Sequence, residues 1–133
     1  CGVTFCDSLD ELLPQSDVVS IHVPLLDSTR HLIDEKRLNS MKSSAFIINT
    51  SRGAVIDEKA LERALKKSVI AGAGLDVFEF EPKVSRGLRK LENVILTPHI
   101  ASASDSARNE MAKVTAQNII DYFEGKMPAN LVS

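Results

Sequence analysis

The chain has 133 residues, of which 44 % are apolar, and its formal net charge is −2. This length and composition are those of one ordinary globular domain, and they exclude two full domains. Charges of both signs are interspersed along the chain, so neither nucleic acid nor an anionic membrane is predicted as a partner. No apolar run approaches the roughly 20 residues of a membrane helix, and we expect a soluble, cytoplasmic setting. Cys1 and Cys6 are interpreted as free thiols, and no metal site is predicted.

The first half of the chain predicts three strands and a short helix. Residues 3–5 are a weak strand candidate. Ser8 and Glu11 form a capping box, in which each side chain satisfies a free backbone N–H, so a helix begins here and Pro14 helps to end it. Two apolar runs bounded by turn residues, 18–23 and 45–49, then predict strands.

The second half predicts two further strands, at residues 71–76 and 94–97, and two helices. Asp57 can cap the first helix, whose apolar positions share one face: Ala60, Leu61, Ala64 and Leu65. The longest helix is expected from about residue 103 to 124, and Gly125 is placed to end it. Several of its residues lie near one stripe: Ala107, Met111, Val114, Asn118 and Phe123. The order β-α-β-α-β-α-β-α predicts a Rossmann-type α/β fold, a doubly wound parallel sheet.

In an open parallel sheet, ligands bind beyond the carboxyl ends of the strands. The residues that follow the four principal strands are therefore the candidates for chemistry: 22–25, 49–53, 76–82 and 97–100. The segment Gly72-Ala73-Gly74 has a different interpretation. It lacks the third glycine of a dinucleotide-binding loop and opens no helix, so its small residues are expected to let a neighbouring element approach closely.

Four polar side chains in these segments each have two interpretations. Arg52, followed by Gly53 at a sharp turn, presents a planar fork that suits a carboxylate, or it pairs with a nearby acid. His99 can give or take a proton near neutrality, or it is a structural or solvent-facing histidine. Glu81 could contact His99 and orient its ring, or it is a surface acid. Asp76 ends an apolar strand and needs a partner, either a cofactor amide or a backbone N–H.

Taken together, these segments resemble the D-isomer-specific 2-hydroxyacid dehydrogenases. That family includes glyoxylate/hydroxypyruvate reductases, phosphoglycerate dehydrogenase, formate dehydrogenase and D-lactate dehydrogenase. The resemblance covers essentially the whole chain, and five motifs carry it: residues 20–25, 41–42, 48–53, 74–82 and 97–102. In this order and spacing the motifs are highly specific.

The resemblance implies a role for each candidate residue. Arg52 binds the carboxylate and carbonyl of a 2-oxo acid, His99 is the acid/base, and Glu81 pairs with His99. The cofactor is NAD or NADP, and Asp76 contacts its nicotinamide carboxamide. The residues implied to contact the cofactor are Val23, Pro24, Thr50, Ser51, Arg52, Asp76, His99, Ala101 and Ser102. The other partner is a small 2-oxo or 2-hydroxy acid, and we expect a homodimer of the full-length protein.

Within the family, residues 101–104 and 128–132 favour glyoxylate/hydroxypyruvate reductases over phosphoglycerate dehydrogenase, which stays as an alternative. A non-catalytic binding module, such as the corepressors that share this fold, is disfavoured because those place a Trp after the His and this chain has none. A structural α/β domain with a relict triad is the third alternative. Whether Arg52, Glu81 and His99 converge in space distinguishes it from an enzyme.

The chain opens on Cys1 and contains no G-x-G-x-x-G loop. We therefore expect residues 1–133 to be the downstream part of a dinucleotide-binding domain, without the first two strands of its sheet, the glycine-rich loop and the substrate domain. The isolated chain is expected to be inactive and to bind dinucleotide poorly, which calorimetry with NADH would test. An uncovered apolar edge of the sheet is also expected, and with it a tendency to associate.

Overall fold

The computed structural model describes residues 2–131. The chain divides into two compact units, Cys1–His99 and Ile100–Ser133, which are described separately. Among the described residues, none of the helices has both the length and the apolar character that crossing a membrane requires. All elements that carry the candidate site, apart from the residues just after His99, belong to the first unit.

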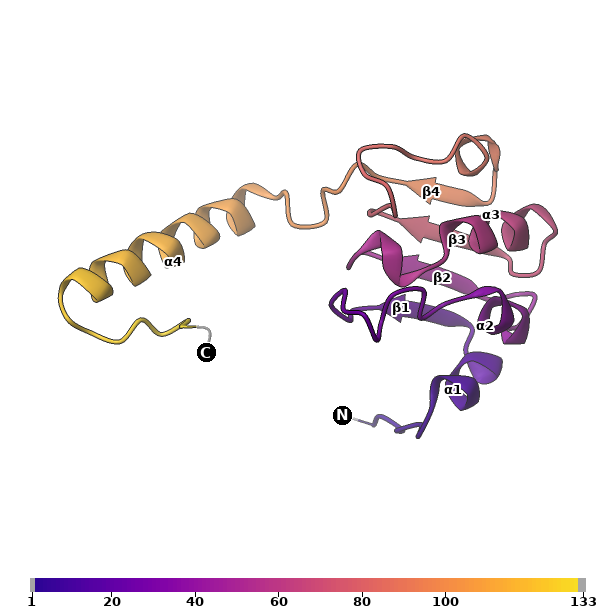
Figure 1. Ribbon diagram of the computed structural model, residues 1–133, viewed down its shortest axis with the longest axis horizontal. Helices are drawn as coiled ribbons and strands as arrows, with labels where there is room; N and C mark the ends of the chain where they lie inside the picture. Colours follow the sequence, from indigo (N-terminus) through magenta and orange to yellow (C-terminus); the bar gives the residue numbers. More distant parts are fainter. Residues whose placement is uncertain (1, 132–133) are drawn as a thin grey trace. The chain divides into compact units, whose positions relative to one another are not determined.

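The first unit is built on a parallel sheet of four strands, in the order β1-β2-β3-β4 (Figure 1). The strands are β1 (Val18–Ile21), β2 (Phe46–Asn49), β3 (Gly72–Leu75) and β4 (Val94–Leu96). The four principal predicted strands and the α/β class are thus confirmed, with slightly shorter strands. The register aligns the last residue of each strand in one row, Ile21, Asn49, Leu75 and Leu96. The segments that follow the strands therefore leave the sheet at the same edge.

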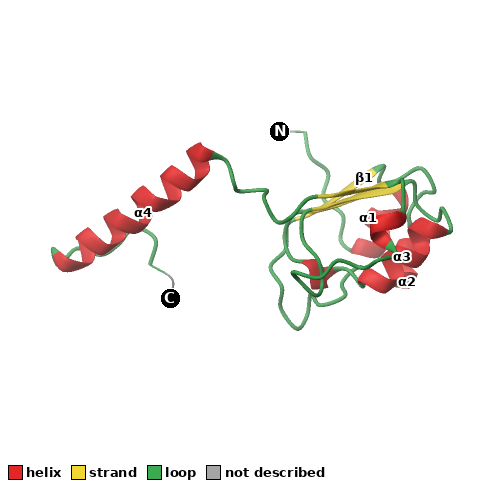
Figure 2. Ribbon diagram, turned by 90° about the horizontal axis from the view of Figure 1, so that it is seen from above, coloured by secondary structure: helices red, strands yellow, loops and turns green. Residues whose placement is uncertain are grey.

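Three helices cover one face of this sheet: α1 (Leu9–Gln15), α2 (Glu35–Ser40) and α3 (Glu58–Lys66) (Figure 2). Each begins at a side-chain cap, because Ser8, Asp34 and Asp57 accept a hydrogen bond from the backbone N–H three residues later. The helix residues that face the sheet pack with buried strand residues and form the hydrophobic core. Its fully buried side chains include Leu13, Leu38, Ile47, Leu61 and Leu65.

The opposite face of the sheet carries exposed apolar side chains. Val18 is 61 % exposed, Phe46 47 % and Ile95 73 %, and their places in the strand register put them on one face. These side chains are exposed on a face of the sheet, and the expected apolar edge and tendency to associate stay predictions. The prediction for the glycines of β3 is confirmed, since a Cβ on Gly72 would lie 2.7 Å from the carbonyl oxygen of Asn93 and one on Gly74 3.0 Å from Ile48 Cδ1.

Several local predictions were wrong. Residues 3–5 form no strand and pair with none of the four strands of the sheet. Glu11 accepts a hydrogen bond from the N–H of Asp7 rather than from that of Ser8. The helix α1 does end near Pro14, as expected, one residue after it at Gln15. The alternating order of strands and helices implied a helix between β3 and β4, although no residues were assigned to it. A loop with one 3₁₀ turn, Leu88–Lys90, takes this place, since Pro82 and Gly87 interrupt the segment.

The second unit contains the long helix predicted near the end of the chain, α4 (Asp105–Phe123). Its N-cap is Ser104, whose hydroxyl accepts a hydrogen bond from the N–H of Ala107. Gly125 follows the helix with a φ of 72°, in the left-handed conformation that commonly ends helices, as the sequence predicted. No residue of α4 is buried, so the predicted stripe that includes Met111 forms no core.

Candidate active site

The turn after β2 is shaped by Asn49, a side chain that is only 1 % exposed. Its Oδ1 accepts hydrogen bonds from the backbone N–H and the hydroxyl of Ser51, both at 3.0 Å, and its Nδ2 donates to the carbonyl of Arg52, also at 3.0 Å. The buried amide therefore fixes the path of Thr50, Ser51 and Arg52. Our sequence reasoning gave Asn49 no role, although a polar residue that ends an apolar strand was a usable signal.

The side chain of Arg52 is directed by this turn and is exposed. Its Nη1 donates to the carbonyl oxygen of Ser51 at 2.7 Å. Within residues 2–131, no acidic side chain forms an ion pair with Arg52. The guanidinium thus retains donors with which to bind an anion.

Gly53 is required by packing and not by the conformation of its backbone. Its φ is not positive, since Gly125 is the glycine with positive φ among the described residues, and Gly53 begins the 3₁₀ turn Gly53–Val55 directly after Arg52. A Cβ on Gly53 would instead overlap the carbonyl group of Phe78 and the amide nitrogen of Glu79. The segment that carries Arg52 therefore lies directly against the segment that leads to Glu81.

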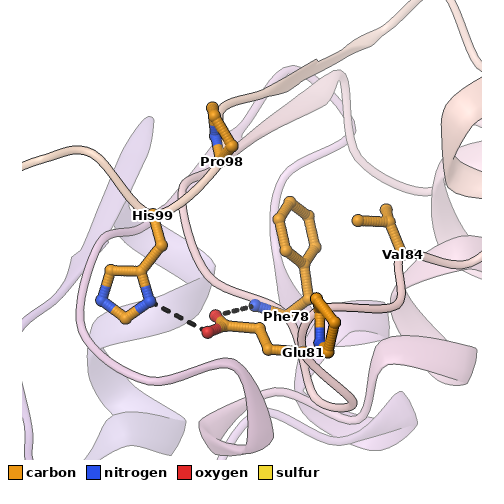
Figure 3. A pocket seen from close by; sticks show the side chains of 6 residues that line it. Phe78, Glu81, Val84, Pro98 and His99 are labelled. Atoms are coloured by element: carbon orange, nitrogen blue, oxygen red, sulfur yellow. Dashed lines mark hydrogen bonds and ion pairs between the residues drawn. The ribbon is translucent and has the colours of Figure 1, made fainter.

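Glu81 and His99 come together from two different loops. Nδ1 of His99 lies 2.9 Å from Oε2 of Glu81, and the other carboxylate oxygen accepts a hydrogen bond from the N–H of Phe78 at 3.0 Å (Figure 3). The backbone of His99 is held as well, because its N–H donates to the carbonyl of Asp76 at 2.9 Å and its φ is 55°. This conformation is uncommon for a residue other than glycine and is typical of functional sites.

Asp76 is 4 % exposed at the end of β3. Its Oδ1 accepts a hydrogen bond from the hydroxyl of Thr97, at 2.5 Å. One partner of Asp76 is therefore a side chain of the neighbouring strand end, in addition to the partners that the sequence suggested. Asp76 ties the segment that precedes His99 to the segment that leads to Glu81.

The pKa of the Glu81 carboxyl lies below its ordinary value of 4.5. The hydrogen bond with His99 is the main cause; the N–H of Phe78 and the positive charges of His99 and Arg52 act in the same direction, against desolvation of the carboxylate. Glu81 is thus held as an anion beside the imidazole ring.

Replacing His99 by glutamine is expected to raise the pKa of Glu81 toward 4.5, because the main group that holds it down is removed. The folded pKa lies below the unfolded one, so the Glu81 contribution to stability is present above about pH 4.5 and is lost as the pH falls through the folded pKa. A carboxyl ¹³C NMR titration would measure the change. Arg52→Gln should produce a smaller rise, and an unchanged titration in His99→Gln would refute the assignment.

The candidate residues border neighbouring hollows at the carboxyl edge of the sheet. One, of about 510 Å³, is lined by the segments after β1 and β2: His22, Val23, Pro24, Leu25, Thr50, Ser51 and Arg52. A second, of about 370 Å³, brings Arg52, Glu81 and His99 together. A third, of about 390 Å³, lies between the Glu81–His99 pair and an apolar wall that includes Phe78 and Val84 (Figure 3). Ala101 and Ser102 belong to the second unit.

Known proteins are similar to this chain over nearly its whole length. A glyoxylate reductase from Thermococcus litoralis is 52 % identical over 132 residues, which are 99 % of this chain and 40 % of that protein. A glyoxylate reductase from Thermofilum pendens is 55 % identical over 126 residues, 94 % of this chain and 37 % of that protein. The chain thus spans about two fifths of the length of these curated relatives.

Solved structures share the fold. The crystal structure of an NADPH-dependent glyoxylate/hydroxypyruvate reductase from Sinorhizobium meliloti, in complex with NADP and malonate, has a TM-score of 0.88 and 38 % identity, with 92 % of this chain and 39 % of that chain covered. The profile of the D-isomer specific 2-hydroxyacid dehydrogenase NAD binding domain matches residues 1–101. By this match and these identities, the chain belongs to the D-isomer specific 2-hydroxyacid dehydrogenase family.

Proposed function

We propose that this chain provides the catalytic edge of an NAD(P)-dependent dehydrogenase that interconverts a 2-oxo acid and a D-2-hydroxy acid, with glyoxylate or hydroxypyruvate as the favoured 2-oxo acid. The observation that carries the proposal is that Arg52, Glu81 and His99, from three separate segments, border one hollow. The names of the relatives, which are glyoxylate reductases, support the substrate class. Residues 1–133 would be the downstream part of the dinucleotide-binding domain of this enzyme.

The hollow beyond β1 and β2 has a lining and a size that fit part of a dinucleotide. Its volume of about 510 Å³ lies in the range of small-molecule sites, and its wall combines apolar Val23 and Pro24 with the hydroxyls of Thr50 and Ser51. These residues would hold NAD or NADP, together with Asp76, Ala101 and Ser102, which remain predicted contacts. When bound, the dinucleotide supplies or accepts the hydride.

His99 is the proposed acid/base. Because a carboxylate can only accept hydrogen bonds, the contact with Glu81 at 2.9 Å indicates that Nδ1 carries a proton. Nε2 is then the ring nitrogen that exchanges a proton with the substrate oxygen. During reduction it would protonate the carbonyl oxygen, while Glu81 stabilises the positive ring before the transfer. In the reverse direction Nε2 would accept the hydroxyl proton.

Arg52 is the proposed anion-binding residue. Arg52 lines both the hollow beyond β1 and β2 and the hollow that Glu81 and His99 border. It can therefore reach a substrate held between the proposed dinucleotide and His99. A carboxylate fits the planar guanidinium of Arg52 with two parallel hydrogen bonds, and the same charge stabilises the oxygen as it becomes negative in the transition state.

A chimera tests the proposed function. The 132-residue matching segment of the Thermococcus litoralis glyoxylate reductase would be replaced by this chain. We expect the chimera to oxidise NADH or NADPH with glyoxylate or hydroxypyruvate, and to prefer these substrates over 3-phosphohydroxypyruvate. The unmodified relative and a thermal unfolding curve of the chimera are the controls. A folded chimera without turnover on any of the three substrates would overturn the proposal.

A further inference from the structure

A buried carboxylate, that of Glu79, lies close to the proposed active site without joining the hydrogen bonds of Glu81 and His99. Its side chain is only 5 % exposed. Its Oε1 lies 2.8 Å from Nε2 of His31 and 3.2 Å from Nη2 of Arg30. A carboxylate removed from water is costly unless donors surround it, and the loop that carries Arg30 and His31 supplies them.

Glu79 also forms a reciprocal contact with Glu58, the first residue of α3. The N–H of Glu79 donates to Oε2 of Glu58 at 2.9 Å, and the N–H of Glu58 donates to Oε2 of Glu79 at 3.4 Å. Glu58 is buried too, and its other oxygen accepts from the N–H of Ser85 at 3.3 Å. Each carboxylate thus binds the backbone of the other residue, which joins the start of α3 to the loop after β3.

These contacts connect the segments that carry the proposed catalytic residues. The turn that follows Arg52 leads directly into α3 at Glu58, and its Ala54 carbonyl accepts a hydrogen bond from the N–H of His31 at 2.8 Å. On the other side, Glu79 lies between Phe78, whose N–H binds the Glu81 carboxylate, and Glu81 itself. Glu79 is therefore placed where the Arg52 segment and the Glu81 segment meet.

We propose that Glu79 is a positioning residue for the reaction proposed above: its buried carboxylate fixes Arg52 relative to the Glu81–His99 pair. The expected effect on catalysis rests on the proposed function. The placement of Glu79 rests on the hydrogen bonds described above. An alternative is that Glu79 only stabilises the fold. The two differ in whether loss of the carboxylate changes the surroundings of Glu81.

The first experiment is the Glu79→Gln variant of the 133-residue chain. A glutamine has one acceptor oxygen, and its NH₂ group would face N–H donors, so the turn from Phe78 to Glu81 should loosen. We expect the pKa of Glu81, read by carboxyl ¹³C NMR, to rise toward its ordinary value. Glu35→Gln is the matched control, because Glu35 is an exposed partner of Arg63 on α3, at 3.0 Å, and it should leave the Glu81 titration unchanged.

A second variant covers the case in which Glu79→Gln does not fold. His31→Asn removes the 2.8 Å contact and keeps a residue that tolerates the φ of 50° found there. It should move the pKa of Glu81 in the same direction by a smaller amount. If the folded variants unfold more easily but Glu81 titrates as in the unchanged chain, Glu79 is structural only and the inference is wrong.

The same variants in the chimera separate the inference from the proposed function. We expect Glu79→Gln to lower kcat roughly 10- to 100-fold, because a small displacement of reacting groups is costly. The KM for the dinucleotide should change by less than about twofold, since the side-chain hydrogen bonds described for Glu79 go to Arg30, His31 and Glu58 and not to Val23, Pro24, Thr50 or Ser51. A lower kcat in Glu79→Gln than in the unmodified chimera supports the inference, and an unchanged kcat in Glu79→Gln overturns it. An inactive unmodified chimera contradicts the proposed function alone, because the NMR result would stand.

Discussion

Gly53→Ala is expected to destabilise the chain by about 3 kcal/mol or more. The new Cβ would overlap the carbonyl of Phe78 and the amide of Glu79, and these backbone atoms cannot move aside as a flexible side chain could. The two segments would have to separate, with loss of the contacts between Glu58 and Glu79. Urea unfolding followed by circular dichroism would measure the change in the free energy of unfolding.

Gly2→Ala is the matched control for this prediction, because no atom lies within 4 Å of the Cβ that it would add. Its unfolding free energy should remain within about 0.5 kcal/mol of that of the unchanged chain. If Gly53→Ala behaved like this control, the close approach of the two segments would not exist in solution. If Gly53→Ala is destabilised as expected, the pKa of Glu81 in the remaining folded fraction should also be higher than in the unchanged chain.

His99→Ala in the chimera is expected to lower kcat about 10³-fold, because the proton donor of the proposed reaction is lost.

Arg52→Lys keeps the positive charge but removes the planar guanidinium, so we expect kcat/KM for glyoxylate to fall about 100-fold. Steady-state rates of NADH or NADPH oxidation at several glyoxylate concentrations would separate kcat from KM.

The control for these two variants is Arg63→Lys, a change of the same type on the exposed surface of α3, where Arg63 pairs with Glu35 at 3.0 Å. Its kinetic constants should equal those of the chimera. A His99→Ala variant with full activity would exclude this histidine as the acid/base. An Arg52→Lys variant with full activity would show that a point charge suffices at this position.

Local sequence patterns, which involve only a few neighbouring residues, predicted much of the fold. The apolar runs gave four strands, and Ser8, Asp57 and Gly125 were correctly expected at the ends of helices. These predictions succeed because a cap or a strand depends mainly on its own neighbours. The helix α2 was not placed, since its six residues bury only Leu38 and show no clear period.

The candidate site was predicted in part for a different reason. Parallel strands end at one edge, so Glu81 and His99 could be expected near each other before their 2.9 Å contact was known. Their chemical roles, and that of Arg52, stay predictions. The contact of Glu58 with Glu79 joins residues far apart in the sequence, and it depends on how the loop after β3 passes over α3. No spacing or composition in the sequence indicates such a path.

Because the last residues of the four strands lie in one row, insertions and deletions have different effects at the two ends of the sheet. One residue added within β2 would reverse the face on which each later side chain lies and advance the chain by about 3.3 Å. The Asn49 side chain would then no longer be buried, and Arg52 would leave the hollow that it shares with His99. One residue added between α2 and β2, near Lys42, would be absorbed at the other end of the sheet. Natural variants of this chain should therefore differ in length at the amino ends of the strands and keep their length at the carboxyl ends.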